Sequence, residues 1–310
     1  MIYEFAVDPT CLKDWQTFRY LIEQFGVSRG RLVSQFPKDW VKQVYGSCST
    51  FTFRQKQQLE IELKRLKCHG LIRSGREFEK SKDWVSNALS QFEKGHPFHA
   101  VIVNNITDPP DRVLIAAELT QTEPYWKVSR EIRVVRTVKA LGDAVGDLLT
   151  IARRIIFVDK MFEPASTRWQ TSLASFISLA LQDRETPPIF EYHTKIHNDE
   201  YEKQEEQRTS DFKNECTRYL SSLLPQGVSI KIVRWDRRDR GDFFHERCIL
   251  TEKGGIRIDW GLDVGKPGET TLVSLLDDAV WRQAWDNFQK DATTYQFIDA
   301  VTVVGSQLVA

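Results

Sequence analysis

The chain has 310 residues, of which 41% are hydrophobic and 28% charged, proportions typical of a globular protein with one large domain or two. Lysine plus arginine and aspartate plus glutamate each number 43, so the net charge of +0 excludes a strongly cationic nucleic-acid-binding coat but leaves a local basic groove open. The five cysteines include no C-x-x-C pair, which argues against a disulfide framework and against a structural zinc site.

The N-terminal residues contain early acidic side chains and no long apolar run, so we expect no signal peptide. No segment approaches the ~18–20 apolar residues that a membrane-spanning helix needs. The sequence therefore predicts a cytoplasmic protein without a membrane span.

Residues 1–130 are predicted to form a mainly helical domain with some strand. Helical spacing of apolar residues and helix-starting signals predict helices at 12–25, from Pro37, at 54–68 and from 81 to about 95. A short strand is expected at 71–73, and the apolar run at 98–103 (FHAVIV) is typical of a buried strand.

Residues 131–310 are predicted to form a second domain, because the pattern after the break at Pro124 alternates between helix and strand. Helices are expected at 135–152, 168–181, 199–224 and 278–290. Strands are expected at 154–162, 189–193, 228–235, 243–250, 255–260 and 272–276. Such alternation predicts an α/β fold in which helices cover a sheet.

The segment 236–263 (DRRDRGDFFHERCILTEKGGIRIDWGLD) contains the residues that point to chemistry. His245 and Arg247 lie two positions apart on an expected strand, so their side chains should point to the same face. An imidazole can attack phosphorus or donate a proton, while a guanidinium can hold phosphate oxygens. Glu252 follows five positions after Arg247, which gives the pattern H-x-R-x-x-x-x-E.

This pattern resembles the H-x-K-x-x-x-x-D motif of the phospholipase D superfamily. The wider segment HERCILTEKGGIRIDWGLD is similar to a branch that includes the C-terminal domain of microtubule-interacting-and-trafficking proteins and related stand-alone bacterial proteins. The strand that contains Asp159 also resembles an early sheet strand of the family. The resemblance covers roughly residues 134–310 and is specific around 243–263.

The resemblance implies a phospholipase D-like sheet flanked by helices and a site that needs neither metal nor cofactor. In that site His245 would be nucleophile or proton donor, Arg247 a phosphate clamp and Glu252 an orienting carboxylate. The implied function is that of a bacterial protein that recognises phosphodiesters and binds or cleaves nucleic acid, in defence against foreign DNA.

Two departures from the family pattern leave an alternative open. Arg247 replaces a lysine and Glu252 an aspartate, and arginine is not a simple substitute for lysine in a crowded site. Family enzymes use two half-sites, whereas this chain has one H-x-R, so a homodimer would have to supply the second. The alternative function is a non-catalytic phosphate-binding, dimerisation or interaction module.

Four further residues are candidates for substrate binding. Asp159 closes a buried strand and either orients the motif or is a polar strand end. His193 is expected near the carboxyl edge of the sheet, where sites in α/β proteins collect. Arg234 and Arg238 belong to an arginine-rich stretch that either pairs with its own aspartates or engages a polyanion.

The N-terminal region also mixes basic and aromatic residues, a pattern that suits nucleic-acid contact but is equally typical of a helical core. The residues concerned are Lys13, Arg19, Arg29, Arg31, Lys38 and Lys42 with Trp15, Phe18, Tyr20, Phe36 and Trp40.

Overall fold

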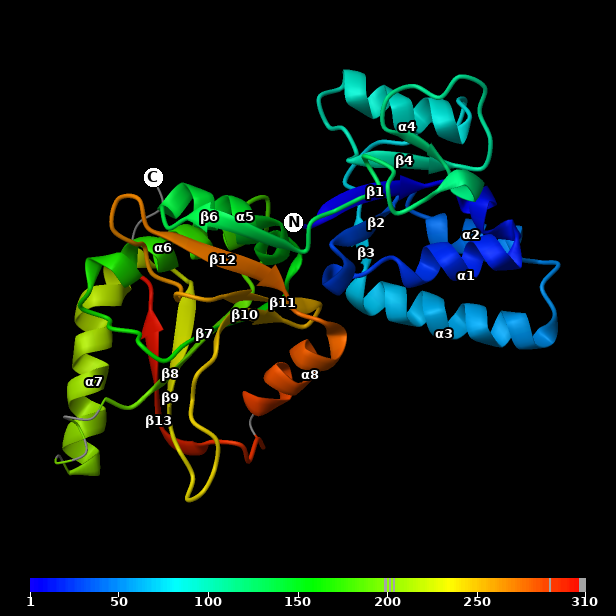
Figure 1. Cartoon of the computed structure of the whole chain (residues 1–310). Coiled ribbons are helices and arrows are strands. Elements are labelled where there is room, and N and C mark those ends of the chain that lie inside the picture. The colour runs from blue at the N-terminus through cyan, green and yellow to red at the C-terminus, as the bar shows by residue number, and fades with distance from the viewer. Residues whose placement is uncertain (198–199, 201, 203, 290, 307–310) are drawn as a thin grey trace. The chain divides into compact units, whose positions relative to one another are not determined.

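Two sheets organise the chain, which divides into the units Met1–Arg130 and Glu131–Ala310. The structure, a computed structural model, describes residues 1–197, 200, 202, 204–289 and 291–306. Each unit contains one sheet flanked by helices (Figure 1). The predicted α/β class is confirmed.

The first unit is built on five parallel strands in the order β3-β2-β1-β4-β5. The strands are β1 (Tyr3–Val7), β2 (Arg31–Gln35), β3 (Leu71–Arg73), β4 (Ala100–Val103) and β5 (Val113–Ile115). The sequence predicts strands only at 71–73 and 98–103, so the central sheet is larger than expected from a mainly helical region. Parallel neighbours require crossover connections, which is why helices separate most of these strands.

The helices of this unit are α1 (Trp15–Glu23), α2 (Trp40–Ser47), α3 (Phe53–His69) and α4 (Trp84–Glu93), with the short 3₁₀ turns η1 (Pro9–Lys13), η2 (Val27–Arg29) and η3 (Ala116–Glu118). Local sequence fixes their ends. Thr52 and Gln55 form a reciprocal capping box at the start of α3, and Gly70 follows its last residue.

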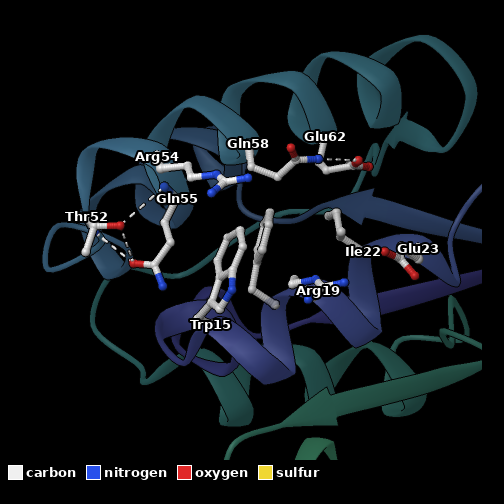
Figure 2. Close-up of a pocket in the computed structure, with 10 residues that line it drawn as sticks. Trp15, Arg19, Ile22, Glu23, Thr52, Arg54, Gln55, Gln58 and Glu62 are labelled. Atoms are coloured by element: carbon white, nitrogen blue, oxygen red, sulfur yellow. Dashed lines mark hydrogen bonds between the residues drawn. The ribbon is translucent and has the colours of Figure 1, made fainter.

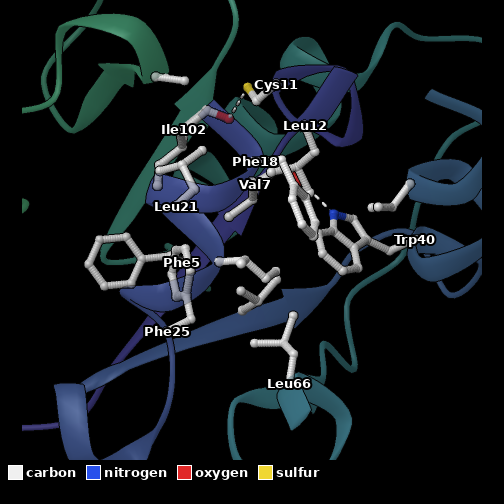
Figure 3. Close-up of a cluster of buried hydrophobic side chains, with 14 of the residues drawn as sticks. Phe5, Val7, Cys11, Leu12, Phe18, Leu21, Phe25, Trp40, Leu66 and Ile102 are labelled. Carbon is white, nitrogen blue, oxygen red and sulfur yellow. Dashed lines mark hydrogen bonds between the residues drawn. The ribbon is translucent and has the colours of Figure 1, made fainter. Parts of the chain in front are cut away.

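The core of the first unit is apolar and rich in aromatic rings (Figure 3). Phe5 on β1 packs edge-to-face against Phe25, with ring centroids 5.8 Å apart. Trp40 at the start of α2 is fully buried, and its indole Nε1 donates a hydrogen bond to the carbonyl oxygen of Val7 (2.6 Å). Trp40 thus anchors α2 to the end of β1.

The second unit contains an eight-stranded mixed sheet in the order β13-β9-β8-β7-β10-β11-β12-β6. Its strands are β6 (Glu131–Val135), β7 (Arg154–Asp159), β8 (Ile189–Lys195), β9 (Ser229–Asp236), β10 (Arg247–Thr251), β11 (Gly254–Ile258), β12 (Thr270–Leu275) and β13 (Gln296–Val304). Its helices are α5 (Val138–Ile151), α6 (Thr167–Leu181), α7 (Glu205–Leu220) and α8 (Asp278–Asn287), with the 3₁₀ turn η5 (Ser221–Leu223).

Strand β7 is a central strand of this sheet with neighbours of both orientations. It pairs in parallel with β8 and antiparallel with β10. Val158 belongs to a core cluster that includes Trp281 and Phe288 on the α8 side, whereas Phe157 stacks on Phe176 of α6. Since both faces are covered, β7 needs a continuous apolar run and not an alternating one.

Some predicted elements differ from the structure. Strand β10 begins at Arg247 and not at Phe243, so His245 lies in the irregular segment just before the strand. The edge strands β6 and β13 occur where the sequence predicts none. A mixed α/β sheet is present, while its membership of the phospholipase D-like group stays a prediction. Within the described residues, no helix is long and apolar enough to cross a membrane.

The packing of Trp40 gives a stability prediction. We expect Trp40→Ala to lower the free energy of unfolding by about 3–5 kcal/mol, because it leaves a cavity and an unpaired carbonyl at Val7. Chemical denaturation of the full chain measures this loss. The control Tyr45→Ala, also on α2 but with a 41% exposed side chain, should change it by less than about 0.5 kcal/mol. Equal effects of the two variants would contradict the anchoring role.

Candidate phosphate-binding site

Asp159 and Arg247 face each other across two neighbouring strands. Asp159 is the last residue of β7, Arg247 is the first of β10, and the antiparallel register pairs them directly. Arg247 Nε lies 3.9 Å from Asp159 Oδ1. Arg247 Nη1 also donates to the carbonyl oxygen of Asp259 (3.1 Å). The guanidinium is therefore oriented by a carboxylate and a carbonyl while its side chain remains 29% exposed.

Asp159 itself is completely buried. The backbone N–H of Met161 donates to its Oδ1 (2.9 Å) and that of Leu262 donates to its Oδ2 (2.8 Å). Burial raises the pKa of Asp159 to about 6, although the two N–H groups and Arg247 pull it down. The carboxylate joins β7, β10 and the loop after β11.

Gly261 permits this close approach of the loop. Its φ of +104° lies in a region that side chains avoid, and an added Cβ would lie 2.6 Å from Asp159 Oδ2. The glycine of the G-L-D segment is therefore required by backbone geometry and by the space that the Asp159 carboxylate occupies.

His245 lies exposed just before β10, and its Nδ1 is 3.3 Å from Lys160 Nζ. A lysine ammonium can only donate, so Nδ1 accepts this hydrogen bond and the ring proton lies on Nε2. Lys160 directly follows Asp159. Lys160, His245 and Arg247, which we call the basic cluster, therefore gather where β7 ends and β10 begins.

Asp263 is the centre of a supporting ion-pair network. Its carboxylate contacts Arg136 Nη2 and Arg168 Nη2, each at 2.5 Å, and Arg136 also reaches Glu269 at 3.1 Å. Arg168 Nε donates to the carbonyl oxygen of Val264 (2.8 Å). These contacts hold the loop after β11 against α6 and against the link between β6 and α5.

Sequence reasoning missed Lys160 and this network. Lys160 could have been found from its place next to Asp159, and Asp263 from the G-L-D segment. Arg136 and Arg168 have no local signal, because only the fold brings them to Asp263.

Glu252 does not lie with His245 and Arg247. It follows the far end of β10, where its carboxylate accepts the backbone N–H groups of Arg153 (3.0 and 3.1 Å) and Arg154 (3.1 Å). An extended strand rises about 3.3 Å per residue, so five positions carry Glu252 roughly 16 Å from Arg247. The orienting role implied by the resemblance has no geometric support here.

His193 lies on the opposite face of the sheet, since it pairs with Val158 of β7. It is buried, and its Nδ1 accepts a hydrogen bond from Trp235 Nε1 (2.9 Å), which leaves the proton on Nε2, 3.1 Å from Glu191 Oε2. Burial lowers the pKa of His193. The side chain is satisfied inside the core and does not join the basic cluster.

Arg234 and Arg238 also have structural partners. Arg234 is fully buried, pairs with Asp299 (2.6 Å) and Glu200, and stacks 3.9 Å over the ring of Phe212. Arg238 Nε donates to the carbonyl oxygen of Tyr295 (3.0 Å). The structure therefore brings Asp159 together with His245 and Arg247, but not His193, Arg234 or Arg238.

The chemistry available at the basic cluster is that of hydrogen-bond donation to an anion. Over the part of the chain that the structure describes, no group of three or more His, Cys, Asp or Glu side chains could hold a metal ion. Lys160 and Arg247 offer positive charge, and His245 offers the Nε2 proton.

Comparison with known proteins adds little. No family model matches the chain, and no curated protein does. Among solved structures, the chain is similar to the archaeal chromatin protein TrmBL2 at 9% identity, over 84% of this chain and 71% of that one, with a TM-score of 0.25. A likeness this low establishes neither fold nor function, so the relation to the phospholipase D superfamily stays a prediction.

The position of Glu252 gives a test of its role. We expect Glu252→Ala to lower the free energy of unfolding by about 1–2 kcal/mol, because it removes the acceptor for two backbone N–H groups. Denaturation of the full chain measures this change. The variant should bind phosphate-bearing ligands as the unchanged chain does. A loss of ligand affinity without a loss of stability would instead support the orienting role.

The buried carboxyl of Asp159 gives a pH prediction. The unfolded chain releases this proton near pH 4, whereas the folded chain keeps it to about 6, so the folded state binds more protons between these values. Stability from this group therefore falls as the pH rises from 4 to 7, by roughly 2–3 kcal/mol. The test compares the free energy of unfolding of the unchanged chain with that of Asp159→Asn at each pH. We expect the difference between the two to fall by this amount from about pH 4 to pH 7. A pH-independent difference would show that the pKa is not raised.

Proposed function

We propose that the chain binds nucleic acid by holding backbone phosphates at the basic cluster. The observation that carries the proposal is the contact between Lys160 and His245 beside the oriented guanidinium of Arg247. Arginine binds phosphate oxygens through paired N–H groups, and lysine adds a point charge. Three hydrogen-bond donors gathered at the ends of β7 and β10 suit a phosphodiester.

The tautomer of His245 favours binding over nucleophilic attack. With Nδ1 accepting from Lys160, Nε2 carries a hydrogen and has no lone pair free for phosphorus. A nucleophilic imidazole would instead place its other N–H against a carboxylate. In this arrangement His245 can donate a hydrogen bond to a phosphate oxygen, which makes binding the primary activity and hydrolysis the alternative.

Exposed aromatic rings beside the basic cluster favour a nucleic-acid strand over a small phosphate. Trp260 is 68% exposed and follows Asp259, the carbonyl partner of Arg247. Phe243 is 59% exposed, and its ring centroid lies 5.7 Å from that of His245. Bases that are not paired stack on such rings while basic groups follow the backbone. A role in defence against foreign DNA and assembly as a homodimer stay predictions.

The binding test uses a fluorescent single-stranded oligonucleotide and the full chain. We expect Arg247→Ala to weaken binding by about tenfold or more, since charged hydrogen bonds to phosphate are lost. The dependence of log affinity on log salt should also become shallower by roughly 0.7. Fluorescence anisotropy across a salt series measures both quantities. Arg153→Ala, which removes an exposed arginine at the other end of β7, is the matched control and should leave both unchanged.

Unchanged affinity in Arg247→Ala, or an equal loss in Arg153→Ala, would refute the proposed site. Hydrolysis is checked in parallel with end-labelled DNA and RNA. If cleavage occurs and disappears in His245→Ala, the alternative of a working phosphodiesterase replaces simple binding. If cleavage persists in His245→Ala, His245 is not the catalytic group.

A further inference from the structure

A groove between α1 and α3 is lined by three of the basic and aromatic residues near the N-terminus, Trp15, Phe18 and Arg19. Phe18 and Trp40 are core residues, and Arg31 is buried with its guanidinium donating to the carbonyl oxygen of Trp126. Trp15 and Arg19 remain accessible and border a cavity of about 560 Å³ (Figure 2). This volume lies within the range of small-molecule sites.

The floor of the groove is a pair of fixed aromatic rings. Trp15 and Phe18 stack with centroids 5.6 Å apart and planes at 19°. Trp15 also packs edge-to-face on Phe51, at 5.4 Å and 90°. Figure 2 shows the Trp15 ring standing between the two helices. Since Trp15 is only half-buried, this packing presents part of a rigid indole to a ligand without further ordering.

Two arginines border the same groove from different helices. Arg19 lies one helical turn after Trp15 on α1, and Arg54 lies in the first turn of α3. Among the described residues, neither guanidinium has a hydrogen bond or an ion pair. Both are therefore available to an anion, and their separate positions suit a group with several oxygens.

The other end of the groove has a different character. Arg65 is occupied there, because it pairs with Glu62 (2.8 Å) and donates to the carbonyl oxygen of Phe25 (3.0 Å). Gln58 Nε2 also donates to Glu62 (3.2 Å). Glu23 lies exposed at this end and can accept N–H groups. The groove thus has arginine side chains toward one end, carboxylates toward the other and aromatic rings at its base.

We propose that this groove binds a nucleoside phosphate. The base stacks on Trp15, and the phosphate lies between Arg19 and Arg54. Aromatic stacking supplies affinity that a bare phosphate lacks, and the two guanidinium groups supply affinity that a bare nucleoside lacks. The site belongs to the first unit and does not depend on the basic cluster.

Titration calorimetry on the full chain tests the proposal with adenosine monophosphate, adenosine and inorganic phosphate. We expect the nucleotide to bind at least tenfold more tightly than either fragment. Arg19→Gln and Arg54→Gln should each weaken nucleotide binding by about tenfold, because each removes a charged hydrogen-bond donor. Lys56→Gln, an exposed neighbour on α3 that does not line the groove, is the matched control.

Two further variants keep the result unambiguous. Trp15→Phe retains a ring in the packing and should weaken the nucleotide more than inorganic phosphate. Arg247→Ala removes the phosphate clamp of the basic cluster and should leave nucleotide binding to the groove unchanged. Nucleotide binding no tighter than phosphate binding, or unaltered in both Arg19→Gln and Arg54→Gln, would overturn the proposal. Loss in Arg247→Ala alone would assign the nucleotide to the basic cluster instead.

Discussion

The buried carboxylate of Asp159 is the constraint on which the second unit's candidate site depends. It accepts N–H groups from Met161 and Leu262 and faces Arg247, so one side chain fixes the end of β7, the start of β10 and the loop after β11. A buried carboxylate is costly unless its oxygens are satisfied. These partners make its burial tolerable, and the same contacts orient the guanidinium that we assign to phosphate.

The sequence predicts those elements whose signal is local. The apolar run of β7 and the alternation of β9 identify buried strands, and both occur in the structure. Strands β2 and β13 are missed, because each contains a charged residue in a buried position. Arg31 on β2 is satisfied by the carbonyl of Trp126, 95 positions away, and Asp299 on β13 by Arg234, 65 positions away. Burial of such groups depends on distant partners that no local pattern shows.

The same distinction holds for the candidate site. The spacing of His245 and Arg247 places them near each other, and the antiparallel register that brings Asp159 to Arg247 comes from the fold. Glu252 shows the limit of reading a motif along the chain. Its spacing suggests a shared site, but an extended strand carries it to the other end of the sheet, where it caps the start of β7. Residues this far apart on one strand can share a site only when the chain between them turns back.

The net charge of zero does not distinguish arginines that stabilise the fold from cations that are available to bind a ligand. Arg234 and Arg136 are buried against carboxylates, and removing either one would take a charged partner from a buried acid. Arg247 is different, because its carboxylate partner is 3.9 Å away and its side chain is partly exposed. Arg19 and Arg54 have no partner among the described residues. In each unit, these available cations lie near an accessible aromatic residue: Trp260 follows the carbonyl partner of Arg247, and Trp15 lines the groove with Arg19 and Arg54. Stacking and charge act together on nucleotides, and this coincidence is the physical reason to look for nucleotide chemistry at both places.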